Sequence, residues 1–359
     1  MRTAAQTTRR ILVIGAVAMM MAAALLLTGC TAADKSSANS GGEKATKTRE
    51  LTLVAYSIPE VAYRKIIPAF QAYWKNKTGE NVKFTESYGG SGAQARAVSD
   101  GLEADVVHLA MEPDVNKIAK AGLIKEGWQE RTKGKGIPTT SLIVLGVRPG
   151  NPKGIADWAD VSRAGVGVIT PDPKTSGGAK WNLLASYGSV SLNGGTGKQA
   201  EDQVLGLYKN AVVLDKSARD ASNTFLKKGL GDVALLWESD ANIGKAEGGT
   251  FDIVIPKSTI LAETAATVVD ETVDKKGTRD VAEAFVDFLF GTEAQKAFAE
   301  TGLRPVDPDV LAQYADKYPQ PAGKLFTIAD FGGWKQANAA FFDDGALYPK
   351  VEAAVAAGK

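Results

Sequence analysis

The chain has 359 residues, which is enough for two domains that each bury a core of their own. Its composition, 44% hydrophobic and 23% charged, is that of an ordinary globular protein and excludes a disordered or fibrous chain. The formal net charge is +1, so no global field attracts nucleic acid, and an anionic ligand has to be held by local geometry. We therefore expect no nucleic-acid partner.

The first 29 residues carry the pattern of an export signal. Arg2, Arg9 and Arg10 precede an uncharged apolar run over residues 11–27, which ends in small residues. A basic start, a short apolar stretch and small residues at its end are typical of a secretory signal peptide. A transmembrane helix is the alternative, but the run is shorter than the roughly 20 residues that a membrane span usually needs.

Cys30 directly follows Leu27-Thr28-Gly29 and is the only cysteine of the chain. This arrangement resembles the bacterial lipoprotein box, in which the cysteine becomes the acylated first residue. A lone thiol in an exported protein forms no internal disulfide, and lipid attachment gives it a role. Residues 30–49 otherwise lack large apolar side chains, so we expect a flexible tether before a folded part that starts near Glu50. The sequence thus predicts an exported cell-membrane lipoprotein that is anchored through Cys30 and faces the extracytoplasmic space.

Strands and helices alternate along the rest of the chain. Period-two or continuous apolar patterns predict strands over 51–56, 81–85, 105–110, 141–147, 165–170, 211–214, 232–237, 251–255 and 267–270. Helical spacing of apolar residues predicts helices over 61–75, from Ala93 onward, and over 116–122, 177–187, 201–209, 222–228, 281–290 and 292–300. Such alternation predicts an α/β fold with parallel sheets covered by helices on both faces. A cleft between two α/β lobes is then the natural ligand site.

Three short segments share one design: each follows a predicted strand, precedes a predicted helix and combines a hydroxyl residue with small residues. They are 88–94, 171–179 and 215–220, with Ser91, Ser176 and Ser217 as their hydroxyl residues. Free N–H groups at a helix N-terminus carry partial positive charge, which suits an anion, and glycine lets the anion approach the backbone. Ordinary N-caps and turns give the same pattern, so these segments alone leave both interpretations open.

Trp237 ends the predicted strand 232–237, so its indole N–H could serve a ligand at the carboxyl end of a sheet, although core packing explains it equally well. Catalysis has little support. The single histidine, His108, lies in an apolar strand and is interpreted as a core residue. With one histidine and one cysteine, the usual transition-metal ligand sets cannot be assembled. We therefore expect no enzyme, no metal and no cofactor.

Several strings occur in order between about residues 50 and 334 and together resemble prokaryotic sulfate-binding proteins, the solute receptors of sulfate/thiosulfate ABC importers. The strings are Gly89-Gly-Ser-Gly92, Asp105-Val-Val107, Ile169-Thr-Pro-Asp-Pro-Lys-Thr-Ser-Gly-Gly178, Trp181-Asn182, Asn223-Thr-Phe225, and Phe326-Thr-Ile328 with Phe331-Gly-Gly-Trp334. The resemblance implies a two-lobed, periplasmic-binding-protein-like (type II) fold that closes around sulfate or thiosulfate. It implies lobe I over 50–138 plus 264–325, lobe II over 139–263, and C-terminal helices over 326–359 that pack on the lobes. It also implies a monomer that delivers the anion to the transmembrane subunits of an ABC importer.

The resemblance further implies a set of hydrogen-bond donors for the anion. Backbone N–H groups would come from Ser57, Ser91, Gly177, Gly178 and Ala218, a hydroxyl from Ser176, and an indole N–H from Trp237. Two positions depart from the family pattern, because Ser57 stands for an aspartate and Lys180 for an arginine. A site of donors suits sulfate, whereas hydrogenphosphate would leave its own proton unpaired there, at a cost of about 1–3 kcal/mol. The alternatives are a receptor for molybdate, tungstate or phosphate, a lipid-anchored ester hydrolase, and a purely structural lipoprotein.

Overall fold

The computed structural model describes residues 47–358, and these residues belong to one compact unit. The predicted signal peptide and Cys30 lie outside the described residues. Within residues 47–358, none of the helices combines the length and the apolar character that crossing a bilayer requires.

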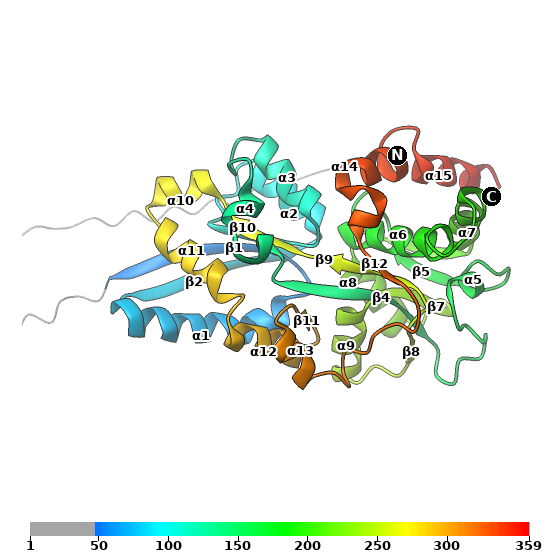
Figure 1. Cartoon of the computed structure of the whole chain (residues 1–359), viewed down its shortest axis with the longest axis horizontal. Coiled ribbons are helices and arrows are strands. Elements are labelled where there is room, and N and C mark those ends of the chain that lie inside the picture. Colours follow the sequence, from blue (N-terminus) through cyan, green and yellow to red (C-terminus); the bar gives the residue numbers. More distant parts are fainter. Residues whose placement is uncertain (1–46, 359) are drawn as a thin grey trace, which may run out of the picture. The chain divides into compact units, whose positions relative to one another are not determined.

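A four-stranded sheet with the order β10-β3-β1-β2 organises the first part of this unit (Figure 1). Its strands are β1 (Thr48–Tyr56), β2 (Asn81–Gly89), β3 (Val106–Leu109) and β10 (Ala265–Val268). β1 pairs in parallel with β2 and β3, whereas β10 runs antiparallel to β3. The helices of this part are α1 (Glu60–Thr78), α2 (Ser91–Ser99), α3 (Glu112–Lys120), α4 (Trp128–Arg131), α10 (Asp270–Lys276), α11 (Arg279–Phe288) and α12 (Thr292–Thr301).

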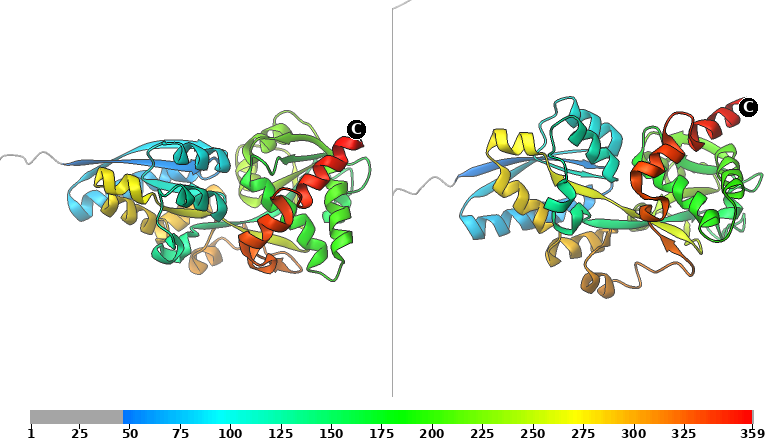
Figure 2. Two further views of the ribbon diagram at one scale, coloured as in Figure 1. Left: turned by 90° about the horizontal axis from the view of Figure 1, so that it is seen from above. Right: turned by 45° about the horizontal axis from the view of Figure 1, so that its top comes forward.

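A second sheet, with the main order β12-β9-β4-β7-β5-β6, organises the other part. Its strands are β4 (Thr139–Val147), β5 (Val168–Pro171), β6 (Ala211–Asp215), β7 (Val233–Trp237), β8 (Asp252–Val254), β9 (Thr259–Glu263), β11 (Arg304–Pro305) and β12 (Leu325–Phe326). The helices that accompany it are α5 (Trp158–Val161), α6 (Gly177–Ser191), α7 (Gly197–Lys209), α8 (Ala218–Leu226) and α9 (Glu238–Ala246). The chain continues with α13 (Pro308–Gln313), α14 (Gly333–Ala337) and α15 (Leu347–Ala357), and Figure 2 shows α15 lying beside α7.

Both sheets are mixed, which corrects the prediction of purely parallel sheets. β5 is parallel to β6 and β7, as expected for strands joined through helices. β4 and β9, however, pair antiparallel with each other. The chain passes from the first sheet to the second along β4 and returns along β9 (Figure 1), so the two strands run in opposite directions.

The folded part begins earlier than predicted. Residues 30–49 were expected to form the tether, but Thr48 and Arg49 belong to β1. The Arg49 guanidinium is almost fully buried because it pairs with Glu80 at 3.1 Å and with Asp280 at 2.6 Å. Composition alone treats an arginine beside a polar run as solvated. Arg49 is buried because it pairs with Glu80 and Asp280, which lie 31 and 231 residues away in the sequence.

Several helices also start earlier than their apolar patterns indicate. α8 was expected near Ser222 but begins at Ala218, because the Ser217 hydroxyl accepts the N–H of Asp220 and caps the helix. α7 was expected at Glu201 but begins at Gly197, after a capping box formed by Thr196 and Gln199. The first turns of both helices consist of polar and small residues, so hydrophobic spacing does not reveal them.

Candidate functional site

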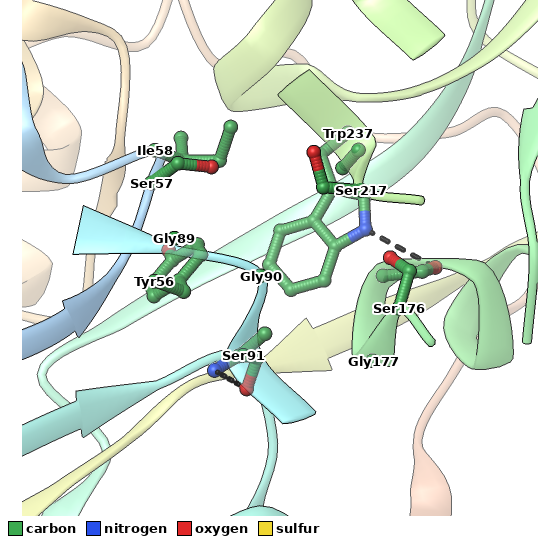
Figure 3. Close-up of a pocket in the computed structure, with 13 residues that line it drawn as sticks. Tyr56, Ser57, Ile58, Gly89, Gly90, Ser91, Ser176, Gly177, Ser217 and Trp237 are labelled. Atoms are coloured by element: carbon green, nitrogen blue, oxygen red, sulfur yellow. Dashed lines mark hydrogen bonds between the residues drawn. The ribbon is translucent and has the colours of Figure 1, made fainter. Parts of the chain in front are cut away.

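A small cavity lies between the two sheets, where the N-terminal ends of α2, α6, α8 and α9 meet (Figure 3). Its volume is about 20 Å³. On the same measure a single water needs about 10–15 Å³, so the cavity admits a group of only a few heavy atoms. The wall consists of Tyr56, Ser57, Ile58, Gly89, Gly90, Ser91, Ala110, Ser176, Gly177, Gly178, Ser217, Ala218 and Trp237.

All seven residues that the sequence singled out as anion contacts lie in this wall. They are Ser57, Ser91, Ser176, Gly177, Gly178, Ala218 and Trp237. Three of the four helix N-termini belong to the segments predicted from sequence. The fourth, that of α9, was missed, because Trp237 was expected to end a strand and no helix was expected after it. Glu238 and Asp240 in the first turn of α9 were the available signal, since acidic residues favour a helix start.

Three of the residues in the cavity wall, Trp237, Ala218 and Ser176, converge on the space in front of Gly178. A Cβ atom on Gly178 would lie 3.2 Å from the indole Nε1 of Trp237, 3.3 Å from Cβ of Ala218 and 3.4 Å from Oγ of Ser176. The indole Nε1 stands 3.5 Å from the carbonyl oxygen of Gly178, which exceeds the roughly 2.7–3.2 Å of a good N–H···O bond (Figure 3). The bond is therefore long, and a nearer acceptor placed in the cavity would be the better partner for the indole N–H.

Ser91 contributes its backbone to the cavity, because its hydroxyl is occupied elsewhere. The hydroxyl donates to Oδ2 of Asp114 at 2.6 Å. It also accepts the N–H of Ala110 at 3.0 Å, the bond dashed at Ser91 in Figure 3. Asp114 is buried, and Lys117 pairs with it at 2.7 Å. These bonds fix the first turn of α2, so its free N–H groups keep a defined direction toward the cavity.

Among residues 47–358, those that form the cavity wall include no Asp, Glu, Lys, Arg or His. Lys180, one of the two departures from the family pattern, lies outside the wall. Its Nζ donates to Oδ1 of Asn338 at 3.0 Å and lies 4.7 Å from the ring centre of Phe342. Burial lowers the pKa of this ammonium group. An anion in the cavity would thus meet helix dipoles and neutral N–H and O–H groups.

His108 lies in the core of the first part, as its apolar strand indicated. It is fully buried in β3, with Nδ1 2.7 Å from the Tyr63 hydroxyl and Nε2 3.0 Å from the Thr264 hydroxyl. Burial lowers the pKa of His108 to about 3, so the imidazole is neutral at physiological pH. In the described part of the chain, no cluster of three His, Cys, Asp or Glu residues has the arrangement of a metal site.

Asp240, in the first turn of α9, is a buried carboxyl with an unusual titration. It is 1% exposed, and neither oxygen has a hydrogen-bond partner within residues 47–358, since the neighbouring Ser222 hydroxyl donates instead to the carbonyl oxygen of Ala218 at 3.1 Å. Burial raises its pKa from 3.8 to about 7, although the nearby Arg219 works in the opposite direction. The carboxyl is neutral in both the folded and the unfolded state at low pH. Its ionisation therefore opposes folding increasingly as the pH rises from about 4 to about 7.

Replacing Asp240 by asparagine should remove this pH dependence at nearly constant volume. As the pH rises from 5 to 8, the free energy of unfolding of the unsubstituted protein should fall, relative to that of Asp240→Asn, by about 2 kcal/mol or more. Urea unfolding at the two pH values measures the difference. The substitution Asp316→Asn, at an exposed position, is the control. Parallel pH profiles for Asp240→Asn and the unsubstituted protein would contradict the interpretation.

Comparisons with known proteins identify the family of the chain. Residues 51–304 match the family of bacterial extracellular solute-binding proteins. The sulfate-binding protein of Synechococcus elongatus is 45% identical over 361 residues, which covers 99% of this chain and 97% of the relative. The sulfate-binding protein of Escherichia coli K12 is 44% identical over 309 residues, covering 85% of this chain and 93% of the relative.

A solved structure gives the same answer for the fold. The sulfate-binding protein SubI from Mycobacterium tuberculosis matches with a TM-score of 0.75 at 40% identity, covering 82% of this chain and 99% of that one. These similarities confirm the family that the sequence strings indicated, together with its two-lobed α/β fold. The chain belongs to the bacterial extracellular solute-binding proteins and, within them, to the sulfate-binding protein family.

Proposed function

We propose that the protein captures sulfate on the extracytoplasmic side of the membrane and delivers it to the transmembrane subunits of an ABC importer, without catalysing a reaction. The observation that carries this proposal is the convergence of four helix N-termini on a cavity of about 20 Å³. The names of the relatives from Synechococcus elongatus and Escherichia coli support sulfate as the anion. Thiosulfate is the nearest variant of the same chemistry.

In this proposal the seven predicted residues act as donors to the anion. Backbone N–H groups of Ser57, Ser91, Gly177, Gly178 and Ala218 join the Ser176 hydroxyl and the Trp237 indole. Sulfate carries no proton at neutral pH and only accepts hydrogen bonds, so donors alone satisfy its four oxygens. Hydrogen bonds to a charged group contribute more than neutral ones, particularly where water is excluded. Local donors can therefore hold a dianion although the chain as a whole is nearly neutral.

Apart from the short strands β11 and β12, the domain arrangement follows the two sheets. Because β1 begins at Thr48, we assign 48–138 and 264–325 to lobe I, 139–263 to lobe II, and 326–359 to C-terminal helices that pack on the lobes. The chain passes between the sheets along β4 and β9, and these strands would serve as the hinge about which the lobes close on sulfate. We further propose that an acylated Cys30 anchors this monomeric receptor to the membrane through residues 30–47.

The substitution Ser176→Ala tests the site directly. It removes one hydroxyl donor to a charged ligand, which is worth about 1.5–3 kcal/mol, so the dissociation constant for sulfate should rise about 10- to 100-fold. Isothermal titration calorimetry measures the affinity, and the fluorescence of Trp237 gives a second signal for binding.

A matched control separates binding from helix capping. Ser176 also caps α6 by accepting the N–H of Ala179 at 3.4 Å. Thr196 caps α7 in the same way through the N–H of Gln199 at 3.2 Å and is not one of the residues that form the cavity wall. Thr196→Ala should lower stability by about 1 kcal/mol and leave the affinity unchanged. Tight binding of another oxyanion, with no response to sulfate, would overturn the ligand assignment.

A further inference from the structure

Trp181 joins the two proposed lobes through one buried hydrogen bond. Its indole Nε1 donates to the carbonyl oxygen of Ala110 at 3.1 Å. Trp181 lies in α6, on the side of the second sheet, whereas Ala110 directly follows β3 of the first sheet. Both residues are buried, and the Trp181 side chain is fully so. The bond thus crosses from one lobe to the other without contact with solvent.

The peptide group of Ala110 connects this bond to the cavity. Its N–H donates to the Ser91 hydroxyl at 3.0 Å, while its carbonyl accepts from Trp181. Ala110 is itself part of the cavity wall. Trp181 lies one helical turn after Gly177, the first residue of α6. The bond therefore ties together two helix N-termini, those of α2 and α6, that face the cavity from different lobes.

The surroundings of Trp181 keep this contact dry. Its ring packs edge to face against Trp334, with the ring centres 4.7 Å apart. A Cβ atom on Gly177 would lie only 2.8 Å from Sδ of Met111, which shows how closely the two lobes approach beside the bond. Separation of the lobes would break the bond and expose both the indole N–H and the carbonyl group to water. The bond is consequently a feature of the closed arrangement alone.

We propose that Trp181 is a positioning residue that latches the closed lobes and sets how long the anion stays bound. This inference rests on the proposed capture of sulfate between the lobes. An interaction made only in the closed state stabilises that state relative to the open one. It acts after the anion has entered, so it should change the dissociation rate constant and leave the association rate constant nearly unchanged. Trp181 does not touch the anion and so adds no donor to the site.

The test replaces Trp181 by phenylalanine and follows the release of labelled sulfate from the full-length protein. We expect the dissociation rate constant to rise about three- to tenfold, the effect of one ordinary net hydrogen bond, with an unchanged association rate constant. Trp158→Phe is a matched control. The Trp158 indole donates to the carbonyl oxygen of Ser258 at the same distance of 3.1 Å, and Trp158 is also buried. Trp158 and Ser258, however, both belong to the part built on the second sheet, so this bond does not join the lobes. Trp158→Phe should lower stability and leave the release rate unchanged.

Replacement of Trp181 by 3-benzothienylalanine, in which sulfur takes the place of the N–H at similar volume, tests the same bond in a protein whose packing is preserved. It should speed release as Trp181→Phe does. An unchanged release rate in this variant, or an equal acceleration by Trp158→Phe, would overturn the latch. Failure of the proposed function looks different, since the unsubstituted protein would then bind no sulfate.

Discussion

The substitution Gly178→Ala is expected to weaken sulfate binding by at least about 100-fold while leaving the protein folded. The added Cβ would stand 3.2–3.4 Å from Trp237, Ala218 and Ser176, in the space that the anion needs. Gly178 is the second residue of α6, and alanine is the better helix former by about 0.5–1 kcal/mol. The close contacts of the added Cβ oppose this gain, so the free energy of unfolding without sulfate should change by only about 1 kcal/mol. Calorimetry and urea unfolding of the same sample separate the two effects.

Gly197→Ala provides the comparison for this prediction. Gly197 is the first residue of α7, and a Cβ there would meet only the Tyr187 hydroxyl at an ordinary 3.5 Å. Its affinity for sulfate should equal that of the unsubstituted protein. If Gly178→Ala bound sulfate with unchanged affinity, the anion would have to occupy another place.

Replacing Arg304 by methionine is expected to lower the free energy of unfolding by about 3–5 kcal/mol, the usual cost of leaving a buried charge unpaired. Arg304 on β11 donates through Nε and Nη2 to the Glu238 carboxylate at 2.9 Å and 2.8 Å, and Nη2 also donates to the carbonyl oxygen of Pro319. Both side chains of the pair are almost fully buried. Burial raises the pKa of Glu238 and Arg304 opposes that rise, so loss of Arg304 would favour the protonated carboxyl.

The double substitution Glu238→Gln with Arg304→Met should recover part of this loss, because it leaves no unpaired charge. Urea unfolding of the unsubstituted protein, of the single variants Glu238→Gln and Arg304→Met, and of the double variant gives the coupling energy of the pair. Lys198→Met, which removes one partner of an exposed pair with Asp202, should cost less than about 1 kcal/mol. If Lys198→Met and Arg304→Met lowered the free energy of unfolding equally, burial of the Arg304–Glu238 pair would be unimportant for stability.

The parts of the fold that could be predicted were those with a local signal. In α1, the apolar spacing of Ile66, Phe70 and Trp74 indicated a helix, and these side chains are buried against the first sheet. The strands β1, β2 and β3 showed β-rich patterns and lie at the expected positions. β9 and α10 were missed. Most of β9 follows no strict alternation, and α10 has charged residues at most of its positions, so neither shows a clear period.

The candidate site shows the same limit. Gly177, Gly178 and Ser176 lie in a distinctive stretch before a helix, so a helix N-terminus could be expected there. Nothing local tells an anion-binding N-terminus from an ordinary cap, because the difference lies in whether other termini face the same point. That convergence depends on how the two sheets are placed, over more than 140 residues of sequence between Ser91 and Trp237. Family resemblance supplied what local patterns could not.

The pairing of β1 also bears on how the receptor withstands pulling from the membrane. β1 is an interior strand, paired in parallel with β2 over nine residues from Thr48 to Tyr56, and Arg49 is clamped by Glu80 and Asp280 at its beginning. Tension on the proposed tether would be directed along this strand. The evenly spaced hydrogen bonds of a parallel pair run across the direction of such a force and are loaded together in shear, whereas an edge hairpin opens one bond at a time. The lipid attachment would thus pull on a part of the molecule that is mechanically hard to unravel.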